Sequence, residues 1–383
     1  PLSDCISLFG GGTPSKQVPE YWNGEIPWAS VKDLKSSRLK QTQDSITELG
    51  LKNSSSKLVK SGTLLIATRM AVGKAAITDI DVAINQDLKA IVCKENIDVK
   101  YLFYFLSSCE NEFAKVSSGA TVKGIKLKHI LDLKIPLPPL TEQKQIAAIL
   151  DAADSLRQKD QQLVEHYTSL SQSLFLEMFG DPETNSKGYE QKKLEELTTL
   201  ITDGTHHTPA YTEEGVPFLR VTDITESNNS KKFISQKEHL ELIKRCRPER
   251  NDILYTKNGT IGVGKIVDWD YEFSIFVSLC LLKPKHEIVE VKYLNFFLNT
   301  PFALNQAAKH SKVATIKNLH LVEIKKMKIP YPSIEEQREF VSKFEKIEQQ
   351  KQQAQTNLQN SEALFNSLLQ RAFTGELTAD RAA

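Results

Sequence analysis

The sequence predicts an α+β protein in which two mixed α/β domains form a tandem pseudo-two-fold repeat, separated by two long antiparallel coiled-coil helices. Three observations support this prediction. The 383-residue chain repeats itself once, each copy ends in a long heptad pattern, and short apolar runs divided by Gly, Asn, Ser and Asp clusters precede each pattern. Its length suits two or three domains, and 40% hydrophobic with 25% charged residues is typical of a globular protein.

The repeat is clearest at the end of each half. Residues 120–143, ATVKGIKLKHILDLKIPLPPLTEQ, match residues 314–337, ATIKNLHLVEIKKMKIPYPSIEEQ. Fainter pairs at an offset of about 190 are residues 24–34 with 215–224, residues 100–106 with 292–298, and residues 67–77 with 256–267. In the last pair a Gly-rich turn follows a short apolar strand, and the position of the gap stays open. A period of half the chain predicts a duplicated domain and not a solenoid.

A helix-start signal closes each copy. A K-I-P-x-P segment favours an extended approach, Thr141 or Ser333 offers an N-cap, and early carboxylates suit the helix dipole. Apolar residues then alternate at spacings of 4 and 3 over about 30 residues, and Leu156, Leu163 and Leu170 are among them. We therefore expect two long helices that pair through these positions.

Charge, cysteines and hydropathy exclude several classes of protein. Lys+Arg 49 against Asp+Glu 48 gives a net charge of +1, so any nucleic-acid surface must be local. Five widely spaced cysteines without a CxxC pair argue against a disulfide framework or a zinc knuckle. No apolar run approaches about 18 residues, and the first residues lack a secretory pattern. We expect no membrane association and a cytoplasmic location.

The motifs and their duplicated order resemble the DNA-specificity (S) subunit of a type I restriction-modification enzyme, along essentially the whole chain. The motifs are G-G-T-P at residues 11–14, D-G-T-H at 203–206, both K-I-P-x-P-x-x-x-E-Q helix starts, and the helix tails at 173–182 and 367–377. The resemblance implies two target recognition domains, each reading one half of a bipartite, asymmetric target in double-stranded DNA. It also implies that the helices set the spacer and dock two methyltransferase subunits.

The resemblance further implies a non-catalytic chain without a cofactor of its own. S-adenosylmethionine, ATP and magnesium are expected in partner subunits, which include restriction/translocase subunits. The predicted boundaries are residues 1–138 and 181–332 for the two recognition domains, 139–180 and 333–375 for the two long helices, and 376–383 for a C-terminal tail. The alternative is a coiled-coil scaffold or tether without sequence-specific DNA reading, against which the divergence of the two copies in their loops argues.

Candidate DNA contacts are basic residues in polar loops or at repeat-equivalent positions. They are Arg69, Lys74, Lys123 and Lys126 in the first domain and Arg220, Lys257, Lys265 and Lys317 in the second. Arginine reads guanine with two hydrogen bonds, whereas lysine more often contacts phosphate. Each residue has the alternative of an ordinary solvated charge.

Enzyme and metal motifs are weak or missing in the sequence. Residues 259–265 fit GxxxxGK, but Ile266 replaces the Ser or Thr that would hold magnesium. A Gly-rich turn that approaches DNA and a plain β-turn both stay open for this segment. His206 and His207 favour hydrogen bonding near a DNA-facing turn over metal ligation. No N-P-P-Y or D-P-P-Y tetrapeptide is present, so we predict no catalytic residue and no metal ligand.

Overall fold

The computed structural model describes residues 1–117, 124–225, 231–309 and 318–379. The chain divides into two compact units. Unit 1 comprises Pro1–Gln162 together with the chain from Ala354 onward, and unit 2 comprises Leu163–Gln353. Each unit therefore combines one mixed domain with a part of both long helices.

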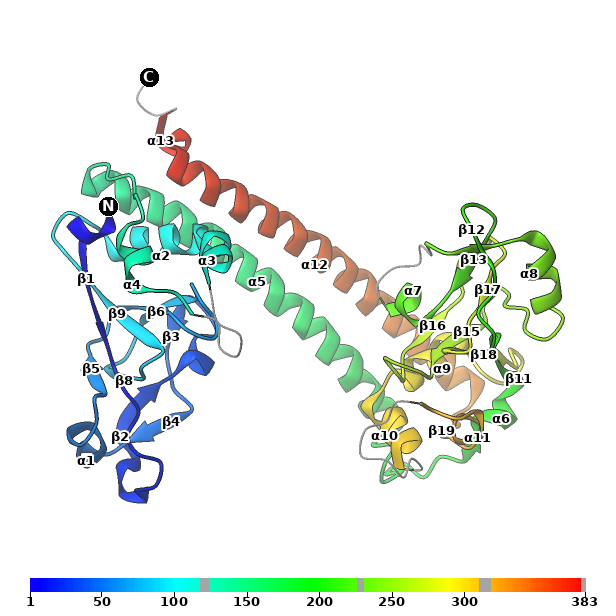
Figure 1. Ribbon diagram of the computed structural model, residues 1–383. Helices are drawn as coiled ribbons and strands as arrows, with labels where there is room; N and C mark the ends of the chain where they lie inside the picture. Colours follow the sequence, from blue (N-terminus) through cyan, green and yellow to red (C-terminus); the bar gives the residue numbers. More distant parts are fainter. Residues whose placement is uncertain (118–123, 226–230, 310–317, 380–383) are drawn as a thin grey trace. The chain divides into compact units, whose positions relative to one another are not determined.

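In the part of unit 1 that the structure describes, the chain forms two sheets and several short helices. Its strands are β1 (Ile6–Gly10), β2 (Trp22–Ala29), β3 (Arg38–Leu39), β4 (Asp44–Ile46), β5 (Lys57–Val59), β6 (Leu64–Ala67), β7 (Ala75–Thr78), β8 (Val82–Ile84) and β9 (Leu88–Cys93). Its short helices are η1 (Leu2–Asp4), η2 (Pro19–Tyr21), η3 (Val31–Asp33), α1 (Glu48–Lys52), α2 (Val99–Ser108), α3 (Glu110–Val116), α4 (Leu127–Leu131) and α13 (Glu376–Ala379). The sheet orders are β1-β9-β6-β7-β3 and β4-β2-β8-β5. All four residues of β6 are buried, which suits its central place between β9 and β7 (Figure 1).

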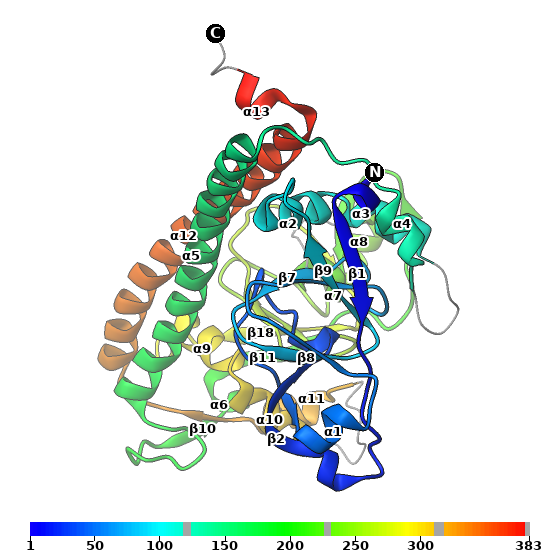
Figure 2. The same ribbon diagram turned by 90° about the vertical axis from the view of Figure 1, so that its left-hand side faces the viewer.

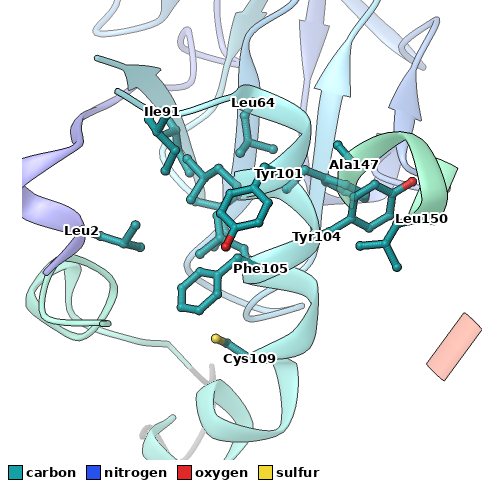
Figure 3. Packing of buried hydrophobic residues seen from close by; sticks show 14 of the residues in the cluster. Leu2, Leu64, Ile91, Tyr101, Tyr104, Phe105, Cys109, Ala147 and Leu150 are labelled. Carbon is teal, nitrogen blue, oxygen red and sulfur yellow. The ribbon is translucent and has the colours of Figure 1, made fainter. Parts of the chain in front are cut away.

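The main core of unit 1 lies between the first sheet and α2. The Asp98 carboxylate caps α2 by accepting from the backbone N–H groups of Lys100 and Tyr101, at 2.9 and 3.0 Å. Tyr101 to Leu106 are all buried. Figure 3 shows Leu64 and Ile91 of the sheet on one side of α2 and, on another, Tyr104 facing the helix that carries Ala147 and Leu150. Burying each large apolar side chain contributes about 1.5–3 kcal/mol, so α2 is a main source of stability in this unit.

The two long helices are α5 (Leu140–Phe179) and α12 (Ile334–Thr374). In unit 1, α2 lies beside the early part of α5 (Figure 2), where Lys100 and Tyr104 contact the Asp151 carboxylate at 2.6 and 2.7 Å. There the Arg157 guanidinium of α5 lies 4.8 Å from the ring centre of Phe365, late in α12.

Unit 2 shows the reverse combination of helix ends. Phe175 and Phe179, late in α5, pack on Phe340, early in α12, with ring centres 5.8 and 5.5 Å apart. Since each unit joins the early part of one helix to the late part of the other, the helices are antiparallel within each unit. The predicted coil seam is wrong in detail, because Leu156, Leu163 and Leu170 are 39 to 45% exposed.

The described residues of unit 2 form three sheets. Its strands are β10 (Gln191–Lys193), β11 (Thr198–Asp203), β12 (Tyr211–Thr212), β13 (Val216–Leu219), β14 (Phe233–Ile234), β15 (Ile253–Thr256), β16 (Gly264–Ile266), β17 (Ser274–Ile275), β18 (Leu279–Pro284) and β19 (Lys328–Pro330). Its short helices are α6 (Leu194–Leu197), α7 (Val221–Thr225), α8 (Gln236–Leu242), α9 (Val291–Leu298), α10 (Pro301–Lys309) and α11 (Leu321–Lys325). The sheet orders are β11-β18-β15-β16, β12-β14-β13-β17 and β10-β19.

The sequence repeat corresponds to a repeated structural frame. The order β1-β9-β6-β7 in unit 1 matches β11-β18-β15-β16 in unit 2. Tyr101 and Tyr293, the tyrosines of the two K-Y-L segments, donate to the carbonyls of Pro136 and Pro330 in the two K-I-P segments, at 3.0 and 2.8 Å. The matched residues therefore hold each domain against the approach to its long helix. Within the described parts of the chain, no helix is both long and apolar enough to cross a membrane.

Candidate nucleic-acid interface

The candidate residues of unit 1 converge on turn 1, residues 68–74 between β6 and β7. The turn closes through two hydrogen bonds to Ala67, whose N–H donates to the Lys74 carbonyl at 2.8 Å and whose carbonyl accepts from Gly73 N–H at 2.9 Å. Gly73 has φ +88°, and an added Cβ would lie 2.7 Å from Cδ2 of Phe113. Met70 also has a positive φ, +66°, and its side chain is 66% exposed. The backbone of turn 1 is therefore tightly fixed, with Met70 at its surface.

Turn 2, residues 257–263 between β15 and β16, has the same backbone. Thr256 N–H donates to the Val263 carbonyl and the Thr256 carbonyl accepts from Gly262 N–H, both at 2.9 Å. Gly262 has φ +83°, and Gly259, with φ +77°, occupies the place of Met70. These matches determine where the gap lies in the alignment of residues 67–77 with residues 256–267. Asn258 is the counterpart of Arg69, and Val263, not Lys265, is the counterpart of Lys74.

A second segment lies beside each turn. In unit 1, Arg69 forms a β-bridge with Gly124, and Ile125 N–H donates to the Thr68 carbonyl at 2.9 Å. This places the N-cap residue of α4, the exposed Lys126, two residues beyond the bridge. In unit 2, Asn258 forms the matching bridge with Asn318. Lys123 and Lys317 lie outside the described residues.

Turn 1 carries a local excess of positive charge. Nη1 of the half-exposed Arg69 lies 3.2 Å from Oδ1 of Asp87, a residue that is only 8% exposed. Nζ of Lys89 donates to the Gln86 carbonyl at 2.7 Å. Burial lowers the pKa of Lys89, the Asp87 carboxylate opposes this, and the nearby Arg69 adds to it. Together with the exposed Lys74, these cations give the local basic surface that the net charge of the whole chain does not reveal.

Unit 2 has a buried charge cluster at the corresponding end of its sheet. Asp203, the last residue of β11, accepts from Lys257 at 3.2 Å, from His206 at 3.2 Å, and from Arg245. Burial alone would raise the pKa of Asp203, but the hydrogen bonds from Lys257 and His206 hold it below its ordinary value. Lys257 is only 5% exposed, so its ammonium is used inside the domain. This ion pair and the burial of Lys257 leave its ammonium without a surface that could face DNA.

The other two candidates of unit 2 have different surroundings. Arg220 is one-third exposed, and its Nε lies 3.2 Å from Oδ2 of Asp223 in α7. Lys265 lies in β16, opposite Leu254 of β15. A phosphate-binding GxxxxGK loop leads into a helix, whereas this segment continues as a strand, so it has no nucleotide cradle. Of the six described candidates, Arg69, Lys74 and Lys126 are brought together at one turn.

Sequence reasoning missed the acidic partners Asp87 and Asp203 and the basic residues Lys89 and Arg245. Arg245 and Lys257 come to Asp203 from 42 and 54 residues further along the chain, so only the sheet pairing brings them together. The described residues contain no group of three side chains able to hold a metal ion.

Comparison with known proteins identifies the family. A family model described as "Type I restriction modification DNA specificity domain" matches residues 1–166 and 186–361. The chain belongs to this family. It is 36% identical over 162 residues to the Type I restriction enzyme EcoR124I/EcoR124II specificity subunit of Escherichia coli, a match covering 40% of each chain. It is 25% identical over 376 residues to the Type I restriction enzyme MjaIX specificity subunit of Methanocaldococcus jannaschii, covering 90% of this chain and 86% of that one.

A solved structure has the same fold as this chain. The S subunit of a type I restriction-modification system from M. genitalium superposes with a TM-score of 0.59 at 17% identity, covering 97% of this chain and 94% of that one. The predicted fold class and the predicted family resemblance are therefore both confirmed.

Proposed function

We propose that this chain is the non-catalytic DNA-specificity subunit of a type I restriction-modification complex, in which unit 1 reads one half of a bipartite, asymmetric target and unit 2 reads the other. The observation that carries the proposal is the pair of turns. They share one hydrogen-bonded backbone but present Arg69, Met70 and Lys74 in unit 1 against Asn258, Gly259 and Val263 in unit 2. Two readers with one frame and different side chains recognise two unlike half-sites, whereas identical readers would recognise a palindrome.

The long helices are proposed to set the spacer and to dock two methyltransferase subunits. Leu156 in unit 1, and Leu163 and Leu170 in unit 2, are apolar side chains of α5 that a partner would remove from water. S-adenosylmethionine, ATP and magnesium would bind in the partner subunits, which include the restriction/translocase subunits, and the complex would act in the cytoplasm. The alternative of a tether without DNA reading gives no reason for two turns with one backbone and different side chains.

The test is to select bound DNA from a random pool with the full-length chain assembled with its methyltransferase subunit. The expected result is two short, unlike sequence blocks at a fixed distance, together with adenine or cytosine methylation within them. The chain alone should transfer no methyl group. Methyl transfer by the pure chain, or assembled complexes without a bipartite preference, would contradict the proposal.

A second experiment tests the role of the helices in spacing. Four helix-forming residues inserted near Asp181, just after α5, would add about 6 Å at a rise of about 1.5 Å per residue. At about 3.4 Å per base pair, the gap between the half-sites should grow by about one to two base pairs while both half-sites stay unchanged. An unchanged gap with full activity would mean that α5 does not set the spacing.

A further inference from the structure

One position in each turn combines a fixed backbone with a change from a half-exposed side chain in unit 1 to a partly buried side chain in unit 2. Arg69 and Asn258 occupy it, as their β-bridges to Gly124 and Asn318 show. The two side chains differ in the base that each recognises with two hydrogen bonds. Arginine pairs with O6 and N7 of guanine, and asparagine pairs with N6 and N7 of adenine.

The surroundings of Arg69 suit a base contact better than a phosphate contact. The largely buried Asp87 carboxylate lies 3.2 Å from Nη1, which restrains the guanidinium while half of the side chain remains exposed. Arginine has five N–H donors, so this ion pair leaves donors for a second, planar partner. A restrained guanidinium loses less conformational freedom on binding than a free one, which favours a contact of fixed geometry.

Met70 adds an apolar group at the tip of the same turn. Its φ of +66° is uncommon for a residue with a long side chain, and Gly259 holds this backbone in unit 2 without strain. Met70 is 66% exposed, so contacts of its side chain within unit 1 do little to offset the free-energy cost of the strained backbone. Strain held at an exposed tip indicates a functional side chain, and an apolar group next to a base-reading arginine fits a thymine methyl or a base step.

Asn258 has a matching feature in unit 2. Its Oδ1 is buried, and within the described residues no donor reaches it. A buried amide oxygen without a donor is costly, so a rotation of the side chain that brings the amide to the surface gives up no hydrogen bond of Oδ1. In that orientation adenine N6 donates to the amide oxygen while N7 accepts from the amide nitrogen.

We propose that this shared position determines base identity in both half-sites: Arg69 reads a guanine for unit 1, with Met70 in apolar contact beside it, and Asn258 reads an adenine for unit 2. The inference rests on the proposed function, because it requires each unit to read its own half-site.

The experiment uses the full-length chain assembled with its methyltransferase subunit and a pool of random DNA. Arg69→Asn should reduce the preference for one guanine in one half-site by about 5- to 150-fold and move it toward adenine, since a good bidentate pair discriminates by about 1–3 kcal/mol. Asn258→Arg should move one adenine of the other half-site toward guanine. Met70→Gly should keep assembly and thermal stability but relax the preference at the base next to that guanine.

Arg250→Asn is the matched control, since Arg250 is also an exposed arginine paired with an aspartate, Asp270, but lies ahead of β15 and away from turn 2. It should leave both half-sites unchanged. If Arg69→Asn does not assemble, Arg69→Lys keeps the charge without the planar fork and should still lose guanine discrimination. Assembled Arg69 variants with the wild-type base preference would overturn the inference. Failure of the proposed function looks different, because the wild-type complex would then select no bipartite site.

Discussion

Unit 1 and unit 2 use the same buried side chain at the start of each long helix but different side chains at each turn. Gln143 and Gln337 are 1% and 0% exposed. Their Oε1 atoms accept from the N–H groups of Asp98 and Glu290, both at 2.9 Å, and each Nε2 donates to two backbone carbonyls. Residues that match between the copies therefore build the frame. In the proposed function, residues that differ on this frame give the two readers different specificities.

The charged ends of the two sheets differ in a similar way. Unit 1 places its carboxylate on Asp87, before β9, where it meets the half-exposed Arg69. Unit 2 places its carboxylate on Asp203, at the end of β11, where it meets the buried Lys257. The same combination of a carboxylate and cations thus holds a cation at the surface in one unit and inside the domain in the other.

The largest effect is expected at the buried charge cluster. Asp203→Asn removes the anion next to buried Lys257 and should lower the free energy of unfolding by about 3 kcal/mol at pH 7. Because the pKa of Asp203 is lowered by folding, its contribution is present above the unfolded pKa of about 3.9 and is lost as pH falls through the folded value.

Urea unfolding between pH 7 and pH 3 measures this contribution. The difference between wild type and Asp203→Asn should shrink below about pH 4. Asp270→Asn, which removes an exposed carboxylate, is the control and should change stability little at any pH. A pH-independent difference for Asp203→Asn would contradict the assigned ion pairs.

A smaller and equal effect in both units is expected at the matched glutamines. Gln143→Ala and Gln337→Ala each leave a backbone N–H and two carbonyls without their partner and should cost about 2 kcal/mol. Gln349→Ala removes an exposed glutamine of the same long helix α12 and should change stability by less than about 0.5 kcal/mol. Denaturant unfolding measures all three. If only one of these two substitutions lowered the free energy of unfolding, the two units would not share a frame at the start of the long helices.

The smallest effect separates strain from crowding in turn 2. Both Gly259 and Gly262 have positive φ, so alanine is strained at either position. An added Cβ would lie 3.7 Å from Val221 at Gly259 but 2.7 Å from Cδ1 of Leu304 at Gly262. Gly262→Ala should therefore lower the free energy of unfolding, measured by denaturant unfolding, further than Gly259→Ala, by about 1 kcal/mol. Equal losses would show that Leu304 moves aside without cost.

The repeat and the helix starts could be predicted from sequence because the signals are local. The prolines and the E-Q pairs lie within a few residues of one another, and Gln143 and Gln337 each donate to the carbonyl of a proline five residues earlier. Ser333 is the N-cap of α12 as predicted and accepts from the Glu336 N–H at 3.2 Å. The prediction for Thr141 is wrong, because α5 already begins at Leu140. The coil seam could not be predicted, since the buried face of α5 also depends on packing against the domains, which leaves Leu156 exposed.

The candidate site was predictable only in part. Arg69, Lys74 and Lys126 come together as expected of a polar, basic turn. The burial of Lys257 depends on Asp203, which lies 54 residues away in the chain and meets it only through strand pairing. The position of the alignment gap between the two Gly-rich turns could not be predicted either. Met70 has a positive φ, a backbone conformation typical of glycine, so the sequence does not reveal that it matches Gly259.

The most direct measurement exchanges one turn for the other. Residues 69–74, RMAVGK, are replaced by residues 258–263, NGTIGV, which have the same length and the same closing hydrogen bonds. The methylation sites of the assembled complex are then mapped across random DNA. The account predicts that the half-site read by unit 1 changes, while the half-site read by unit 2 and the spacing between them stay the same. Unchanged half-sites in a folded, methylating complex would contradict the claim that the turns carry specificity.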